Sequence, residues 1–179
     1  MIRNVDHLPN TDIICKPGVK LATLAYSIFL ELRYSLVRSD LVILHAGTND
    51  INTCSAQELL EVVGNIVKAY RERFQGHIGF STIIPRPRDG HKLAERVKIY
   101  NQQLVAWCAI NGCLCLRTHG PFLKGGQPRT QLFNRGKLHL TERGLFPSGS
   151  YVLKNFLRSQ LADRTLLPKI REIEARFYA

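Results

Sequence analysis

The sequence predicts an α/β fold in which helices pack against a parallel sheet. Short apolar runs alternate with longer stretches of helical periodicity, and this alternation is typical of strands joined by right-handed crossover connections. The run Leu41 to Leu44 has no polar interruption, which favours a strand buried on both faces. The chain has 179 residues, of which 45% are hydrophobic, enough for one domain with a full core.

The N-terminal elements follow from local signals. Residues Thr11 to Cys15 form a short predicted strand, closed by Lys16-Pro17-Gly18. Apolar residues recur at helical spacing from Lys20 to Val37 and predict a helix. Leu41 to Ala46 is the next predicted strand, and the chain leaves it through Gly47-Thr48-Asn49-Asp50.

The second helix has a recognisable start. Ser55 with Glu58 three residues later predicts a capping box, because each residue can pair with the other's backbone N–H. The periodic residues continue to about Phe74, and Gly76 ends the helix. His77 to Ile84 is the following strand.

The next segments repeat the pattern. Pro85 to Gly90 breaks the strand. The next helix is predicted from Lys92 to Ile110, and its inner face is formed by Leu93, Val97, Tyr100, Leu104 and Trp107. Asn111-Gly112 caps this helix, and Cys113 to Leu116 is a strand. Thr118 to Lys137 is rich in Gly and predicted to be irregular.

The chain is predicted to contain one domain and a tail. The domain covers residues 1–162 and closes with a helix from Tyr151 to Leu161. Residues 163–179 form a charged amphipathic helical tail, with the helix from Leu166 to Phe177.

Composition limits the compartment and the cofactors. The first residues lack the apolar segment of a signal peptide, and no apolar run is long enough to span a bilayer. Five cysteines form an odd count without framework spacing, so a reducing, cytoplasmic location is expected. Cys113-Leu114-Cys115 lacks the two-residue gap usual at metal or redox sites, and neither a metal nor a cofactor is expected.

The charge is strongly basic. Lys and Arg number 25 against 14 acids, for a net charge of +11, which favours RNA or single-stranded DNA as a partner. A basic surface without a partner is an equal alternative. If two loops meet at one sheet edge they form a basic rim, defined here by their Arg and Lys residues: Arg86, Arg88, Arg117, Lys124, Arg129, Arg135, Lys137 and Arg143.

The turn after the buried strand carries the candidate chemistry. α/β proteins place their sites at the carboxyl ends of strands, where Gly47, Thr48, Asn49 and Asp50 lie. The Asn49 amide can donate a hydrogen bond to a developing oxyanion. Asp50 is expected to cap the loop that follows it. His45 is expected to be a hydrogen-bonded core residue.

These segments resemble SGNH (GDSL-type) esterase domains, especially those encoded by vertebrate retroelements. The matching segments are Gly47-Thr48-Asn49-Asp50, Ile83-Ile84-Pro85-Arg86-Pro87, Leu138-His139-Leu140-Thr141 and, more weakly, Cys15-Lys16-Pro17-Gly18. The resemblance implies a flavodoxin-like three-layer α/β/α sandwich with strand order 2-1-3-4-5. It also implies Gly18 and Asn49 as oxyanion donors and His139 as the base.

The chain departs from that family at two positions. Residues from Met1 onward resemble those that follow the family's Gly-Asp-Ser, so the serine nucleophile and the first strand are expected to be missing. A strand-donating partner or a homo-oligomer would then complete the sheet. Gly136 stands where the family has an aspartate, three residues before His139. Glu142 would have to reach back to replace it.

Three functional hypotheses remain open. The first is an esterase-like domain that is not catalytic, with His139 vestigial. The second is a module that binds nucleic acid with the same fold, since fold alone does not decide function. The third is an active esterase whose serine lies upstream. Ser148 precedes a predicted helix and is expected to cap it rather than replace the nucleophile.

Overall fold

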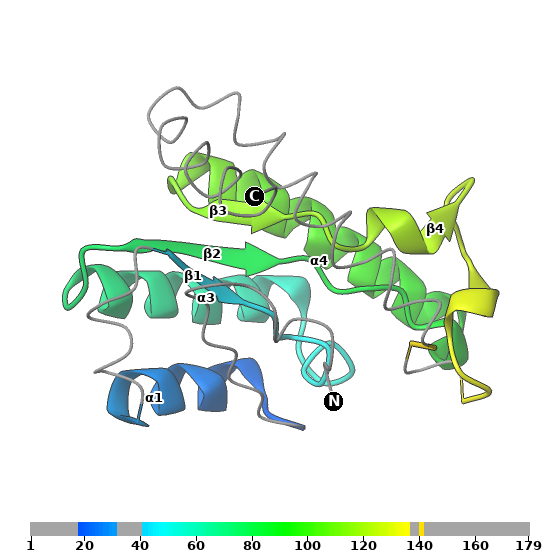
Figure 1. The fold of residues 1–179 in the computed structure, drawn as a ribbon, viewed down its shortest axis with the longest axis horizontal. Helices are drawn as coiled ribbons and strands as arrows, with labels where there is room; N and C mark the ends of the chain where they lie inside the picture. Colours follow the sequence, from blue (N-terminus) through cyan, green and yellow to red (C-terminus); the bar gives the residue numbers. More distant parts are fainter. Residues whose placement is uncertain (1–17, 32–40, 137–139, 142–179) are drawn as a thin grey trace, which may run out of the picture.

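The computed structural model describes residues 18–31, 41–136 and 140–141 (Figure 1). The predicted strand from Thr11 and the helices from Tyr151 and Leu166 lie outside these residues. Along the chain, the described elements are α1 (Leu21–Glu31), β1 (Leu41–Leu44), α3 (Ala56–Arg71), β2 (His77–Ser81), η1 (Pro87–Asp89), α4 (Gly90–Ile110), β3 (Leu114–Leu116), η2 (Gly120–Phe122), β4 (Leu123–Lys124), β5 (Gln127–Pro128) and η3 (Thr130–Leu132).

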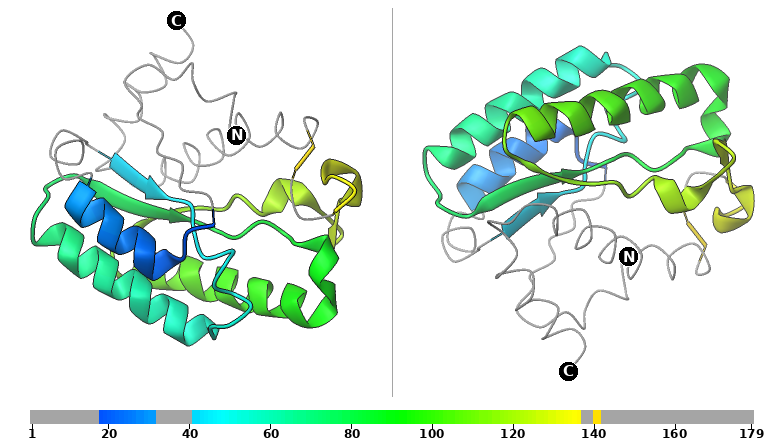
Figure 2. Two further views of the ribbon diagram at one scale, coloured as in Figure 1. Left: turned by 90° about the horizontal axis from the view of Figure 1, so that it is seen from below. Right: turned by 90° about the horizontal axis from the view of Figure 1, so that it is seen from above.

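The three longer strands form one parallel sheet in the order β1-β2-β3, which confirms the predicted strand direction. Leu41 lies opposite His77, and Gly79 lies opposite Leu114. Helices α1, α3 and α4 cover the same face of this sheet (Figure 2). α3 packs against both α1 and α4, and α4 packs against β3. Since the strands are parallel, their carboxyl ends all point toward the same edge.

The start of α3 is determined locally. The Glu58 N–H donates to Ser55 Oγ at 3.2 Å, and the Ser55 N–H donates to Glu58 Oε2 at 2.7 Å. These bonds form the predicted capping box. The hydrogen bond from the Ser55 backbone also lowers the pKa of Glu58, because it stabilises the carboxylate.

The core lies between the sheet and the three helices. α4 buries Leu93, Val97, Tyr100 and Leu104, as predicted, whereas Trp107 of the same predicted inner face is half-buried. α4 also buries one polar residue that helical periodicity did not identify, Asn101. A polar side chain in this position requires partners, which the loop after β2 provides.

The stretch after β3 contains more structure than predicted. β4 and β5 pair as a hairpin across Gly125 and Gly126, which have φ values of 56° and 78°. Phe122 and Phe133 lie beside it in a second small core, with ring centroids 5.9 Å apart. Among the helices of the described residues, none has both the length and the apolar character needed to cross a membrane.

Candidate functional site

The turn that follows β1 is closed by its own backbone. The N–H groups of Asp50 and Ile51 both donate to the Gly47 carbonyl at 3.1 Å. Gly47 has φ 99°, a conformation that residues with a Cβ rarely adopt. A Cβ at this position would also lie 3.4 Å from Ile83 Cδ1. The sequence Gly47-Thr48-Asn49-Asp50 therefore folds as a tight turn against the loop after β2.

Asn49 connects this turn to the segment before α1. Its Nδ2 donates to the Val19 carbonyl at 3.1 Å, and the residue is exposed. Gly18, next to Val19, has φ 72°. The structure therefore brings together the segments of Asn49 and Gly18, which lie far apart in the sequence. Among the residues that the structure describes, the second hydrogen of Nδ2 meets no acceptor, so it can donate to an anion or a carbonyl oxygen.

Asp50 has a different role from the one predicted. Its side chain is buried, and Oδ2 accepts the Leu21 N–H at 3.1 Å. The Asp50 side chain therefore caps the first turn of α1 and not the loop that follows it. In that loop, the Asp50 backbone carbonyl accepts hydrogen bonds from Thr53 and Cys54. A carboxylate is favoured there because the first N–H groups of a helix lack intrahelical partners.

Arg86 is held inside this site. Only 10% of its side chain is exposed; NH1 donates to the Thr48 carbonyl, and Nε lies 2.5 Å from Asp89 Oδ2. Arg96 donates to the carbonyls of Asn52 and Cys54 at 3.1 and 2.7 Å. Two arginines thus hold the backbone after β1, and neither was predicted to do so. These contacts leave Arg86 poorly placed to meet a phosphate in the basic rim.

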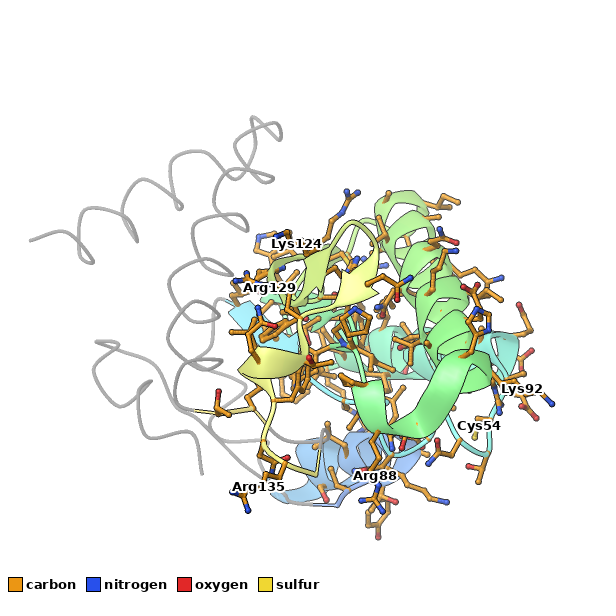
Figure 3. All side chains as sticks on the ribbon, turned by 90° about the vertical axis from the view of Figure 1, so that its right-hand side faces the viewer. Cys54, Arg88, Lys92, Lys124, Arg129 and Arg135 are labelled. Carbon is orange, nitrogen blue, oxygen red and sulfur yellow. The ribbon has the colours of Figure 1, made fainter. Side chains whose placement is uncertain are left out.

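Four members of the basic rim lie on the side to which the strands point (Figure 3). Figure 3, which views this side, shows Arg88, Lys124, Arg129 and Arg135 together with Lys92. Arg129 is half-buried and donates to the Pro121 carbonyl at 3.2 Å. Arg88, Arg117, Lys124 and Arg135 are exposed. Residues 112–136 contain no Asp or Glu, so no acid of that stretch offsets the charge.

A polar network that the sequence did not reveal lies beyond β2 and β3. Thr118 Oγ1 donates to the Thr82 carbonyl at 2.5 Å, and Thr82 Oγ1 donates to the Leu116 carbonyl at 3.3 Å. His119 Nδ1 lies 2.8 Å from Thr82 Oγ1. In its neutral form His119 hydrogen-bonds to Thr82 Oγ1, and the tautomer of the ring determines which of the two groups donates. Burial, reinforced by Arg117, lowers the His119 pKa and favours this neutral form.

His45 and Ser81 face each other at the ends of β1 and β2. His45 Nδ1 hydrogen-bonds to Ser81 Oγ, which agrees with the hydrogen-bonded role expected of His45. The residue is nevertheless exposed rather than part of the core. Enough protein surrounds the ring to lower its pKa by desolvation.

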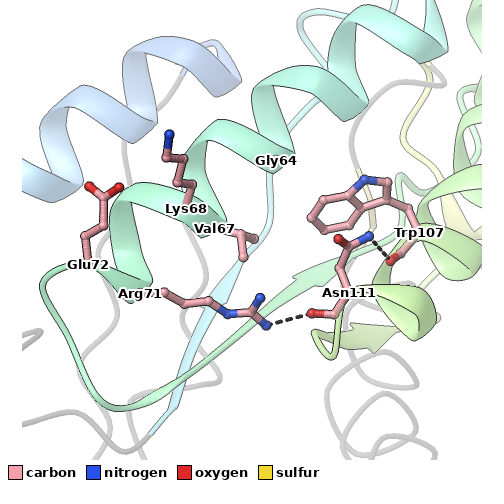
Figure 4. A pocket seen from close by; sticks show the side chains of 7 residues that line it. All are labelled: Gly64, Val67, Lys68, Arg71, Glu72, Trp107 and Asn111. Atoms are coloured by element: carbon pink, nitrogen blue, oxygen red, sulfur yellow. Dashed lines mark hydrogen bonds between the residues drawn. The ribbon is translucent and has the colours of Figure 1, made fainter.

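A shallow groove lies away from this edge. It has a volume of about 470 Å³ and lies between α3 and α4, lined by Val67, Lys68, Arg71 and Trp107 among others (Figure 4). Arg71 NH2 donates across it to the Asn111 carbonyl at 2.7 Å. None of the candidate residues lines it. Within the described ranges, no three His, Cys, Asp or Glu residues gather as metal ligands would.

The family follows from a match over most of the chain. The sequence model of the GDSL-like lipase/acylhydrolase family matches residues 22–145. The chain belongs to the GDSL-like lipase/acylhydrolase family. No curated protein sequence matches it.

Solved structures of GDSL proteins share the fold. A lipolytic protein of the G-D-S-L family from Veillonella parvula is 21% identical, with 79% of this chain and 76% of that chain covered and a TM-score of 0.65. A GDSL-like lipase from Bacteroides thetaiotaomicron is 14% identical, with 79% of this chain and 73% of that chain covered and a TM-score of 0.62. The esterase domain of the ORF1 protein of the zebrafish ZfL2-1 retrotransposon is 22% identical, with 84% of this chain and 88% of that chain covered and a TM-score of 0.50. These similarities confirm the predicted fold class.

The remaining predicted site residues of this GDSL-family chain lie outside the described residues. They are His139, Lys137, Arg143, Glu142 and Ser148. Gly136 is among the residues that the structure describes, and it is exposed. A Cβ there would meet Asn134 Oδ1 at 3.4 Å.

Proposed function

We propose that the chain is a GDSL-type domain that keeps the carbonyl-binding half of an ester site but does not hydrolyse esters efficiently. The hydrogen bond from Asn49 Nδ2 to the Val19 carbonyl is the main support. It brings the Asn49 amide to the segment of Gly18, and the resemblance assigns both residues to the oxyanion.

The chemistry of these groups suits a carbonyl oxygen that gains negative charge. Fixed N–H donors stabilise such an oxygen without reorganisation during the reaction. Asn49 is exposed, so a ligand can reach its amide. Gly18 lies beside Val19 and is exposed, and the resemblance assigns its backbone N–H to the same oxygen.

The proton-transfer half is incomplete in these 179 residues. Gly136 has no carboxylate with which to orient His139, and a base without an orienting partner loses most of its effect. The sequence contains no Gly-Asp-Ser segment. Ser55 is engaged with Glu58, and Ser81, which hydrogen-bonds to His45, is buried and closed to a substrate. Oxyanion stabilisation and binding alone leave only about 10³- to 10⁴-fold acceleration over water.

Hydrolysis of p-nitrophenyl acetate by the 179-residue chain tests this proposal. We expect no turnover above that of His139→Ala, and no labelling by a serine-directed fluorophosphonate. Turnover that is lost in His139→Ala and titrates with the fluorophosphonate would show an active esterase and overturn the proposal. Lys68→Ala, in the distant groove, is the matched control.

A second function, binding of single-stranded nucleic acid, is favoured by one observation. Arg88, Lys124, Arg129 and Arg135 lie on the same side of the molecule (Figure 3). Cations spaced over one surface can neutralise several phosphates at once, which produces salt-sensitive binding. Fluorescence anisotropy with a labelled single-stranded RNA measures this binding directly.

A further inference from the structure

Arg86 joins the ends of two strands at the proposed site. It lies in the loop after β2, yet its NH1 donates to the carbonyl of Thr48, in the turn after β1. With only 10% of its side chain exposed, this guanidinium is a fixed part of the site and not a mobile surface cation. Thr48 directly precedes Asn49, so Arg86 contacts the peptide unit that carries the Asn49 N–H.

We infer that Arg86 is a positioning residue that sets the direction in which Asn49 presents its amide donors. The peptide group is planar and trans, so a donor that fixes the Thr48 carbonyl also fixes the plane of the Thr48–Asn49 unit. The Asn49 N–H then points opposite to the carbonyl. The Asn49 side chain starts from the same fixed plane and reaches the Val19 carbonyl.

Asp89 holds the guanidinium in place. Its Oδ2 lies 2.5 Å from Arg86 Nε, while NH1 of the same group reaches Thr48. The two groups form an ion pair, although Arg86 Nε and Asp89 Oδ2 make no hydrogen bond of good geometry among the described residues. The planar guanidinium faces this carboxylate and the Thr48 carbonyl at once, which the single ammonium of lysine does less well. The positive group also polarises the Thr48–Asn49 peptide, so its N–H becomes a stronger donor.

A second hydrogen bond connects the turn to the rest of the domain and does not involve Arg86. The Leu21 N–H donates to Asp50 Oδ2 at 3.1 Å, one residue beyond Asn49. This bond reports whether the turn as a whole remains folded. A change confined to Asn49 therefore separates positioning from general support of the loop.

NMR of the ¹⁵N-labelled 179-residue chain tests the inference, with the Asn49 side-chain amide pair assigned through its loss in Asn49→Asp. In Arg86→Lys we expect the Asn49 side-chain and backbone amide signals to shift toward those of an asparagine in an unstructured peptide, because the amide loses its fixed orientation. The Leu21 amide signal and the thermal midpoint stay close to the parent's. The control variant Arg88→Lys, at an exposed position two residues away, should leave the Asn49 signals, the Leu21 signal and the thermal midpoint unchanged.

Two outcomes overturn the inference. One is that the Asn49 side-chain amide signals are unchanged in Arg86→Lys, which would mean that a positive charge alone orients Asn49 or that the Arg86–Thr48 contact does not affect it. The other is a joint shift of Asn49 and Leu21, which would mean that Arg86 only supports the loop. If Arg86→Lys does not fold, Asp89→Asn keeps the arginine and frees its fork, and the same Asn49 shift is expected without movement of Leu21.

The inference rests on the proposed function, because it concerns Asn49 as the donor to an ester oxygen. Its test does not need turnover. An active enzyme in the p-nitrophenyl acetate assay would contradict the proposed loss of hydrolysis and leave the NMR result intact. An unchanged Asn49 signal would contradict the role of Arg86 whatever the assay gives.

Discussion

Asn101 pairs with both backbone groups of Ile83. Its Oδ1 accepts the Ile83 N–H and its Nδ2 donates to the Ile83 carbonyl, each at 2.8 Å. Ile83 lies just beyond the end of β2, where the sheet no longer supplies partners. A side chain of α4 thus replaces a neighbouring strand, and it holds the loop that leads to Arg86.

Removing this amide should be costly. Asn101→Ala leaves two buried backbone groups without partners, and each such group costs about 1–3 kcal/mol. We therefore expect a loss of roughly 2–6 kcal/mol in the free energy of unfolding, measured by urea denaturation. Gln102→Ala, at the exposed neighbouring position, should stay within about 0.5 kcal/mol of the parent. A loss below about 1 kcal/mol for Asn101→Ala would show that water satisfies Ile83 instead.

Tyr70 presents the opposite case. Its hydroxyl is buried and has no hydrogen-bond partner among the described residues. Tyr70→Phe should therefore leave the free energy of unfolding unchanged or raise it by up to about 1 kcal/mol, because an unsatisfied polar group is removed. Tyr70→Leu is the matched control: it loses the ring contact with Phe74, at a centroid distance of 5.1 Å, and should destabilise the chain. Destabilisation by Tyr70→Phe equal to that of Tyr70→Leu would reveal a partner for the hydroxyl.

His119 should make stability depend on pH. Burial and Arg117 lower its pKa below the ordinary 6.5, so the unfolded chain binds the proton first as the pH falls. Its contribution is fully present above 6.5 and is lost as the pH falls from 6.5 toward the folded-state pKa. The free energy of unfolding should thus decrease from about pH 7 to pH 5. His45, whose pKa is also lowered, adds to the same slope.

Urea denaturation of His119→Asn across this pH range measures the effect. The slope should become shallower, whereas His91→Asn, at an exposed position of α4, should keep the parent slope. Equal slopes in the parent and His119→Asn would mean that the ring titrates alike in both states.

Local signals explain what the sequence could predict. The capping box of Ser55 and Glu58 spans three residues and depends on little else, so the start of α3 is predictable. The turn Gly47 to Asp50 is likewise marked by a glycine with positive φ next to an apolar strand.

The polar contacts of the site could not be predicted, because their partners are distant in sequence. Asp50 caps a helix 29 residues earlier in the chain, and Arg86 reaches a carbonyl 38 residues away. The sequence predicts Arg86 to be part of the basic rim, whose side chains are expected to be available to nucleic acid. Only the packing of the loops after β1 and β2 shows that it is buried and already bonded.

Charge reversal on the basic rim should weaken nucleic-acid binding. Single-stranded RNA loses affinity with salt in proportion to the phosphates that are neutralised, so three contacts give a fall of roughly 20-fold between about 50 and 200 mM salt. The triple variant Arg88→Glu, Lys124→Glu, Arg135→Glu should abolish that binding, since these exposed side chains lie on one side (Figure 3). Lys124→Glu and Lys68→Glu carry the same charge change, but Lys68 lies in the groove between α3 and α4. If net charge alone drives binding, the two single variants will weaken it equally. If the basic rim is the binding surface, Lys124→Glu will weaken binding and reduce the salt slope, while Lys68→Glu will leave both close to the parent values.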